Sequence, residues 1–157
     1  MHHFIIRAIG KAQADWQREA QKNIRTKVST FSRVEIIELP EGHKGSAKPD
    51  EVRTRRTEAE TLLKGIPAGA FVVALDETEK NYSSVEFARA VDEWTGGGRT
   101  VVFLIGGSWG LDPEVRRTAH ATVSLGRQTL PHLLARIVLL EQLYRAETIL
   151  NGKVYHK

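Results

Sequence analysis

Short runs of apolar residues alternate with longer amphipathic segments along the chain. Glycine, proline or an acidic residue ends each run, and the runs are rich in the β-branched and aromatic residues typical of strands. Five strands are therefore expected, over residues 4–9, 34–39, 70–75, 100–105 and 120–125. The amphipathic segments predict helices over 15–28, 50–64 and from 83 to the glycines at 96–98, a short helix from 112, and a long one from 131 or 132 to about 150.

Strands that alternate with helices indicate an α/β fold, a mostly parallel sheet of about five strands with helices on both faces. At 157 residues and 41% hydrophobic content, the chain is long enough for one domain, residues 1–157, with a substantial core. Ser83 and Glu86 have the spacing of a capping box, and Pro113 suits the first position of a helix. In the first helix, a stripe of Trp16, Ala20 and Ile24 is expected to face the sheet.

The last helix is apolar around most of its circumference. A helix of this kind is buried on more than one side. In so small a domain, we expect one of those sides to face a second subunit. The residues responsible are Leu133, Leu134, Ile137, Val138, Leu139, Leu140, Leu143 and Tyr144.

The segment 101–112 is the most informative one for function. Five apolar residues lead into Gly106, Gly107 and Gly110, as expected of a strand buried on both faces that ends in a loop open to a ligand. Ligands of open α/β sheets bind beyond the carboxyl ends of the strands. Taken alone, a glycine pair is more often a tight turn. Two further strands end similarly, at Leu75 and Leu125, and parallel strands would bring all three ends to one edge of the sheet.

Common nucleotide and metal motifs are missing from the sequence. The loop reads G-G-x-x-G rather than the dinucleotide fingerprint G-x-G-x-x-G, and residues 43–46 do not complete a P-loop. Hydride transfer and nucleoside triphosphate hydrolysis are therefore not expected. The chain lacks cysteine, and its six histidines show no metal-binding spacing, so no metal site is predicted.

Charge and termini add weaker expectations. The formal net charge of +4 leans toward polyanionic partners. Lys44, Lys48, Arg53, Arg55 and Arg56 could bind nucleic-acid phosphates, although a solvated helix face beside a loop is an equal alternative. We expect neither a signal peptide nor a membrane span, and a cytoplasmic location.

Several short motifs, in order and at similar spacing over almost the whole chain, resemble one enzyme family. They are Leu75-Asp76-Glu77, Ser83-Ser84-x-Glu86-Phe87-Ala88, Leu104-Ile105-Gly106-Gly107-x-x-Gly110, Ser124-Leu125, Thr129-Leu130-Pro131-His132, Leu143-Tyr144-Arg145-Ala146 and Tyr155-His156-Lys157. The chain resembles the bacterial pseudouridine N3-methyltransferases of large-subunit ribosomal RNA, which belong to the SPOUT class. The sequence departs from the family at Ser108-Trp109, at Arg127-Gln128, and in lacking a proline before the terminal Tyr155-His156.

The resemblance implies an S-adenosylmethionine-dependent enzyme with a C-terminal trefoil knot. It implies a homodimer that methylates a pseudouridine of large-subunit RNA in the assembled ribosome. Together with the strand ends, it assigns cofactor binding to Leu75, Gly106, Gly107, Leu125, Gly126, Arg127, Gln128, Thr129, Leu130 and Pro131, and catalysis to Arg145, Tyr155 and His156.

The expected roles of the catalytic residues follow from the charge changes of methyl transfer. Arg145 would stabilise the uracil anion, His156 would accept the proton, and Tyr155 would orient or stack on the base. Two alternatives stay open. One is a SPOUT methyltransferase for another RNA position, and the other is a ribosome-binding factor without catalytic activity.

Overall fold

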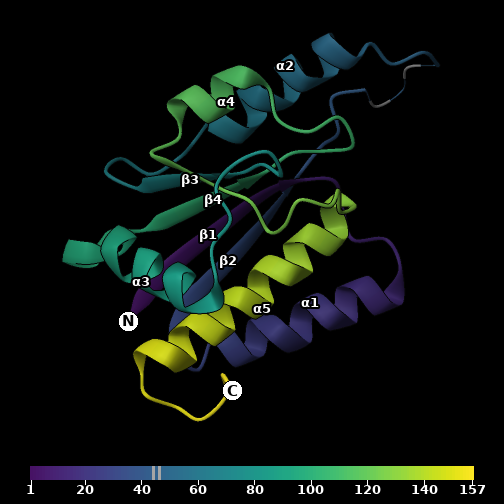
Figure 1. Cartoon of the computed structure of the whole chain (residues 1–157). Coiled ribbons are helices and arrows are strands. Elements are labelled where there is room, and N and C mark those ends of the chain that lie inside the picture. The colour runs from purple at the N-terminus through teal and green to yellow at the C-terminus, as the bar shows by residue number, and fades with distance from the viewer. Residues whose placement is uncertain (44, 46) are drawn as a thin grey trace.

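The computed structural model of the chain describes residues 1–43, 45 and 47–157. Its centre is a sheet of five strands in the order β2-β1-β4-β3-β5, with every neighbouring pair parallel, as Figure 1 shows. The predicted α/β fold is therefore confirmed, and the carboxyl ends of all five strands lie at one edge. The strands are β1 (His2–Ile9), β2 (Ser32–Leu39), β3 (Phe71–Leu75), β4 (Val101–Ile105) and β5 (Ala121–Val123).

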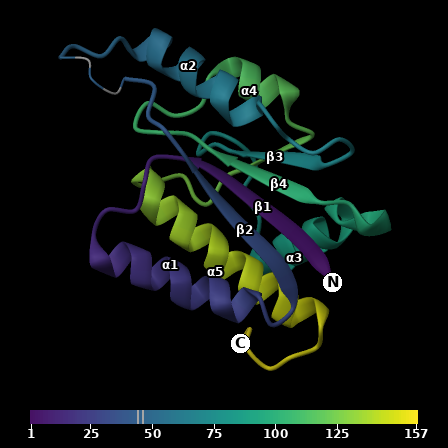
Figure 2. The ribbon, with the colours of Figure 1, turned by 180° about the vertical axis from the view of Figure 1, so that it is seen from behind.

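Helices cover both faces of the sheet, and each face has its own core. On one face, α1 (Asp15–Val28), α3 (Ser84–Trp94) and α5 (His132–Leu150) pack together, and the view from behind in Figure 2 shows the same layer. On the other face lie α2 (Glu51–Leu63) and α4 (Pro113–Thr118). The central strand β4 is buried along its whole length between the two cores, as its unbroken apolar run predicts.

The helix-start signals in the sequence are confirmed. The Glu86 amide donates to the Ser83 hydroxyl at 3.2 Å, and the Ser83 amide donates to the Glu86 carboxylate at 2.7 Å, so α3 begins with a capping box. Asp112 caps α4 by accepting from the Glu114 amide at 2.9 Å, with Pro113 at the first helical position.

The prediction for Trp16 is wrong. Ile24 and Val28 do reach the core, but α1 packs more on α5 than on β2. Trp16, in the first turn, is left 57% exposed. The strand expected over 120–125 is also shorter, because Ser124 leaves β5 to bridge Asn81 in the loop before α3.

Two charged residues of the last helix, α5, are buried, although the sequence pattern suggests that its buried sides are apolar. Arg136 is fully buried and donates to the Glu38 carboxylate at 2.7 Å and to the Gly10 carbonyl at 3.0 Å. Glu147, 2% exposed, accepts from the Ser32 hydroxyl at 2.6 Å and lies 2.7 Å from His2 Nδ1. These contacts tie α5 to both ends of β1 and β2. None of the described helices is long and apolar enough to cross a membrane.

Candidate active site

A cavity of about 890 Å³ opens at the carboxyl edge of the sheet. Its walls are residues 75–78 after β3, 105–111 after β4, and 128–132 at the entry to α5, together with Leu125 and Gly126. Three strand ends that are far apart in the sequence thus converge, as the parallel sheet requires. Such a volume is typical of a site for a cofactor or small substrate.

The structure brings almost all predicted cofactor-binding residues to this cavity. Those that line it are Leu75, Gly106, Gly107, Leu125, Gly126, Gln128, Thr129, Leu130 and Pro131. Arg127 is the exception: its side chain is exposed and lies outside the cavity lining. The loop geometry explains the difference, because the residues on either side of Arg127 line the cavity while Arg127 itself projects into solvent.

The glycine loop after β4 is both a tight turn and a cavity wall. The Gly110 amide donates to the Gly107 carbonyl at 3.0 Å, and Gly110 has a φ of 78°, which favours glycine. A Cβ on Gly106 would lie 2.6 Å from the Gly110 carbonyl oxygen, so this position has no room for a side chain. Trp109 lies at the tip of the loop, lines the cavity and is 41% exposed. The backbone can therefore approach a ligand closely here.

Two charged side chains of the cavity lining, Asp76 and Arg116, are paired with one another. Asp76, at the end of β3, lies 2.9 Å from Arg116 of α4 and also accepts from the Thr78 hydroxyl at 2.6 Å. Burial acts to raise the pKa of Asp76, but the hydrogen bonds from Thr78 and the charge of Arg116 outweigh burial and lower it. Asp76 is therefore a carboxylate at neutral pH.

We expect Asp76→Asn to lower stability more at neutral pH than in acid. A carboxylate with a depressed folded-state pKa stabilises the fold above its unfolded value of about 3.9, and this contribution disappears as the pH falls through the folded value. The free energy of unfolding, measured by urea titration, should be about 1 kcal/mol lower in the variant near pH 7, and the difference should be smaller near pH 3. Asp92→Asn, an exposed carboxylate on α3, is the control and should match at both. An equal loss at both pH values would contradict the assignment.

Three cationic or titratable residues of the cavity were not among the predicted cofactor-binding residues. Arg55 comes from α2, Arg116 from α4 and His132 from the start of α5. Burial lowers the pKa of His132, whose ring packs against Gly10. Arg55 and Arg116 carry no local sequence signal for this site, since they reach the cavity only when the crossover helices α2 and α4 fold over the sheet.

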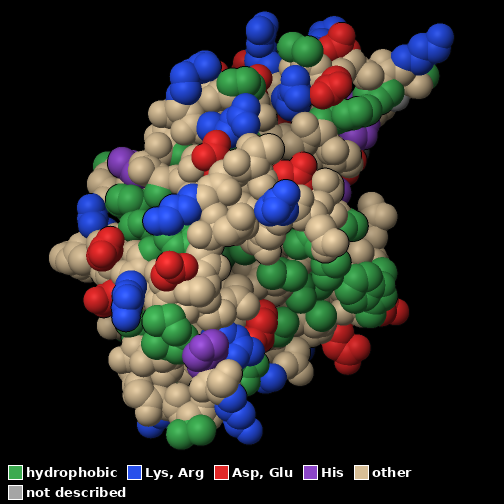
Figure 3. All heavy atoms as spheres, in the orientation of Figure 1, with side chains coloured by type: hydrophobic (Ala, Val, Ile, Leu, Met, Phe, Trp, Pro, Cys, Tyr) green, Lys and Arg blue, Asp and Glu red, His purple; other side chains and the backbone are tan. Residues whose placement is uncertain are grey.

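The basic residues around α2 do not form one continuous surface. Arg53 and Arg56 are exposed, whereas Arg55 is half-buried, pairs with Glu51 at 2.9 Å and lines the cavity. Lys44, which the sequence grouped with them, lies outside the described residues. Figure 3 shows lysines and arginines over α2 and α4 interspersed with acidic side chains.

The three predicted catalytic residues also lie together, beside the C-terminal half of α5. The chain turns back after the helix, with the Lys153 amide donating to the Thr148 carbonyl at 2.8 Å. This turn places the Tyr155 ring 4.6 Å from the Arg145 guanidinium, and His156 Nδ1 lies 3.4 Å from Arg145 Nη1.

Glu141 holds this cluster in place. Its carboxylate accepts from Arg145 at 2.8 Å and from the Tyr155 hydroxyl at 3.0 Å. Partial burial and the hydrogen bond to Glu141 raise the pKa of Tyr155, so its phenol is a proton donor at neutral pH. The tail is thus a structured element packed on α5.

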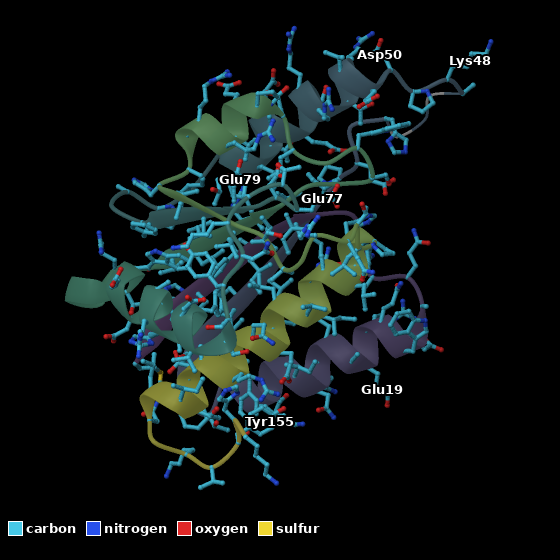
Figure 4. All side chains as sticks on the ribbon, viewed as in Figure 1. Glu19, Lys48, Asp50, Glu77, Glu79 and Tyr155 are labelled. Carbon is cyan, nitrogen blue, oxygen red and sulfur yellow. The ribbon has the colours of Figure 1, made fainter. Side chains whose placement is uncertain are left out.

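The cavity and the tail cluster lie at opposite ends of α5. His132 lines the cavity and Arg145 follows thirteen residues later, which corresponds to about 20 Å along a helix. Figure 4 shows Glu77, which lines the cavity, well apart from Tyr155. Within one chain, the tail cluster does not reach the cavity.

A family model described as "Predicted SPOUT methyltransferase" matches residues 1–156. The chain belongs to the SPOUT methyltransferase family. Relatives named "Ribosomal RNA large subunit methyltransferase H" support this membership over the full length. The protein from Anaeromyxobacter sp. (strain Fw109-5) is 42% identical, with 96% of each chain covered, and that from Gluconacetobacter diazotrophicus is 39% identical, with 96% of this chain and 94% of the relative covered.

Two solved structures share the fold of this SPOUT methyltransferase at low sequence identity. One, a "probable methylase family protein" from Haemophilus influenzae Rd KW20, has a TM-score of 0.53 and 13% identity, and the match covers 99% of this chain and 70% of that one. The other, a methyltransferase from Legionella pneumophila with bound SAM, has a TM-score of 0.51 and 12% identity, covering 90% and 65%.

Membership confirms two predictions made from the sequence. SPOUT methyltransferases use S-adenosylmethionine (SAM) as methyl donor, so the protein is a SAM-dependent methyltransferase. The family also has the trefoil knot, which no periodicity along the chain could have predicted. In the described part of this SPOUT methyltransferase, no group of three or more metal-ligating side chains is placed to hold a metal ion.

Proposed function

We propose that this SPOUT methyltransferase methylates N3 of a pseudouridine in large-subunit ribosomal RNA. The observation that carries the proposal is the full-length similarity to relatives named as large-subunit ribosomal RNA methyltransferases, at 42% and 39% identity. That name favours methylation of large-subunit ribosomal RNA over the two alternatives, a SPOUT methyltransferase for another RNA position or a ribosome-binding factor without catalytic activity. The pseudouridine N3 target rests on the motif resemblance and agrees with the residues that the tail presents.

The cavity at the strand ends is the proposed cofactor site. Its volume of about 890 Å³ lies within the range of small-molecule sites. Leu75, Leu125 and Leu130 offer apolar surface for an adenine ring, while the backbone of Gly106, Gly107 and the 126–131 loop offers hydrogen bonds. Bound SAM supplies an electrophilic methyl group on a sulfonium cation. The same cavity carries both charges: Asp76 is paired with Arg116, and Glu77 and Arg55 also line it.

The tail cluster is the proposed site for the target base. Methyl transfer to N3 requires loss of the N3 proton, and the resulting uracil anion is stabilised by a nearby fixed cation. Arg145 supplies that cation, with its orientation set by Glu141. His156 accepts the proton, and Tyr155 packs against the base or orients it. Anion and sulfonium neutralise each other as the methyl moves, so a closed, dry site favours the transition state.

A homodimer completes the site, in our proposal, with the tail of one chain beside the cavity of the other. This arrangement resolves the separation of about 20 Å within one chain. An apolar surface is available for it: Leu134 at the start of α5 is 36% exposed and Trp16 is 57% exposed. Figure 3 shows hydrophobic side chains gathered over this region. We propose the assembled ribosome as substrate and a cytoplasmic location.

Two measurements test the proposal in sequence. Calorimetric titration with SAM, and separately with its demethylated product, should show one binding site per chain. The protein is then incubated with SAM and intact ribosomes that lack the modification, and the RNA nucleosides are analysed. A new N3-methylpseudouridine supports the proposal. SAM binding with methylation of a different nucleoside, or with none on either ribosomes or free subunits, would contradict it.

A further inference from the structure

Glu58 of α2 is a buried carboxyl group that no step of the proposed reaction uses. It is 2% exposed and lies outside the cavity lining, directly behind the glycine loop. Burial raises its pKa, while the backbone amides of Gly42 and Gly107 act in the opposite direction. Because burying a carboxyl group is costly, its place in the fold calls for a compensating role.

Two loops at the carboxyl edge of the sheet lie against the Glu58 carboxyl group. The Gly42 amide, after β2, donates to Oε1 at 3.1 Å. Gly107, after β4, lies so close that an added Cβ would be 3.0 Å from Oε1 and 3.1 Å from Oε2. The same Cβ would be 3.0 Å from Ile9 Cγ2 at the end of β1. Oε2 has no hydrogen-bond partner among the described residues.

We propose that Glu58 is a positioning residue for cofactor binding. Its carboxyl group supports Gly107 on the side away from the cavity and holds the backbone of the glycine loop in the position that the cofactor requires. This inference rests on the proposed use of the cavity for SAM. A loop of glycines has no side chains of its own to anchor it, so its backbone position depends on what lies underneath. Without the carboxyl group, the loop can shift toward α2, and its backbone groups then move away from the ligand.

The Gly42 contact makes the support rigid. A Cβ on Gly42 would lie 2.6 Å from the Thr54 carbonyl oxygen, so this loop packs directly on the backbone of α2. The Glu58 side chain of α2 is therefore fixed by the Gly42 loop on one side and faces Gly107 on the other. Outer groups that orient a binding residue in this way commonly change affinity by about tenfold or more when removed.

Cofactor affinity of three variants tests the role. Glu58→Ala should raise the dissociation constant for SAM about tenfold. Glu58→Gln keeps the volume and an oxygen that accepts from Gly42, so it should stay within about twofold. Glu147→Ala is the matched control: Glu147 is also 2% exposed and hydrogen-bonded, but at the opposite edge of the sheet. It should lower the thermal midpoint and leave SAM affinity within about twofold.

A second readout needs no cofactor. Trp109 lies in the glycine loop, whereas Trp94 is buried and Trp16 is on α1, so fluorotryptophan labelling gives three reporters in one protein. In fluorine NMR of the cofactor-free protein, Glu58→Ala should shift or broaden the Trp109 resonance and leave the other two unchanged. Glu58→Gln and Glu147→Ala should preserve the wild-type Trp109 resonance. A Trp109→Phe variant assigns the signal.

The outcomes separate the two hypotheses. If wild-type protein does not bind SAM, the proposed cofactor site fails, while the Trp109 resonance still decides whether Glu58 positions the loop. An unchanged Trp109 resonance in Glu58→Ala overturns the inference. So does a loss of SAM affinity in Glu147→Ala equal to that in Glu58→Ala, which would point to general destabilisation. If Glu58→Ala does not fold, Glu58→Asp withdraws the carboxyl group by one methylene and should give both effects in weaker form.

Discussion

Arg145→Ala lowers the turnover number of methyl transfer about a hundredfold, and the dissociation constant for SAM stays within about twofold of the wild type. This is the expected result because, in the proposed site, the Arg145 guanidinium faces the target base and is not among the residues that line the proposed cofactor cavity. Loss of a fixed cation that stabilises a developing anion typically costs two to three orders of magnitude in rate. The measurement is methyl transfer from radiolabelled SAM to ribosomes at saturating cofactor.

Arg89→Ala is the control for this experiment. Arg89 is an exposed arginine on α3, outside the cavity and the tail cluster, and its loss should leave the rate unchanged. Arg145→Lys keeps a positive charge without the planar fork and should give an intermediate rate. If Arg145→Ala turns over at the wild-type rate, Arg145 has no part in the mechanism. A parallel loss of SAM affinity would instead indicate that the helix itself has shifted.

Two inactive variants should restore activity when they share a dimer. Arg145→Ala lacks the tail cation, and Thr129→Trp fills the cofactor cavity with an indole from an exposed position. If the tail of each chain serves the cavity of its partner, a mixed dimer keeps one intact site. Random pairing of equal amounts should give about a quarter of the wild-type rate, since half of the dimers are mixed and each has one of two sites.

Co-expression with two different affinity tags lets the mixed dimer be purified directly. Each variant expressed alone should be close to inactive, and a mixture of separately folded proteins reports how fast subunits exchange. A purified mixed dimer as inactive as its components would show that each tail serves the cavity of its own chain. A protein that runs as a monomer in solution would remove the shared site altogether.

Local patterns predicted most of the framework. The five apolar runs form the five strands, and α3 begins at the capping box of Ser83. Both features depend on residues close in sequence, so the sequence predicts them. Trp16 shows the limit of such patterns: helical spacing defines a stripe but not which of its turns another element will cover. The burial of Arg136 was equally hidden, since its partners Glu38 and Gly10 lie about a hundred residues away in the chain.

The candidate site was likewise predicted only in part from the sequence. Glycines after a buried strand marked the cavity, because parallel strands must end at one edge. Arg116 and Glu58 reach the site from crossover helices, and no spacing in the sequence relates them to Gly107. The grouping of Arg145 with Tyr155 and His156 rested on the family resemblance. Its geometry depends on the turn after α5, which ordinary reasoning about chain ends would have described as frayed.

The length of α5 sets the distance between the proposed cofactor cavity and the tail within one chain. Its 19 residues form a rod of about 28 Å that begins at the cofactor cavity and ends at the turn before the tail. Because a helix does not stretch, the distance between the two reaction centres of a symmetric dimer would be constant. Adjustment to a particular RNA surface then depends on the segment after the helix, residues 151–157, since residues 126–131 belong to the proposed cofactor site. Exchanging this tail between relatives, with α5 left intact, is the expected route to altered target choice.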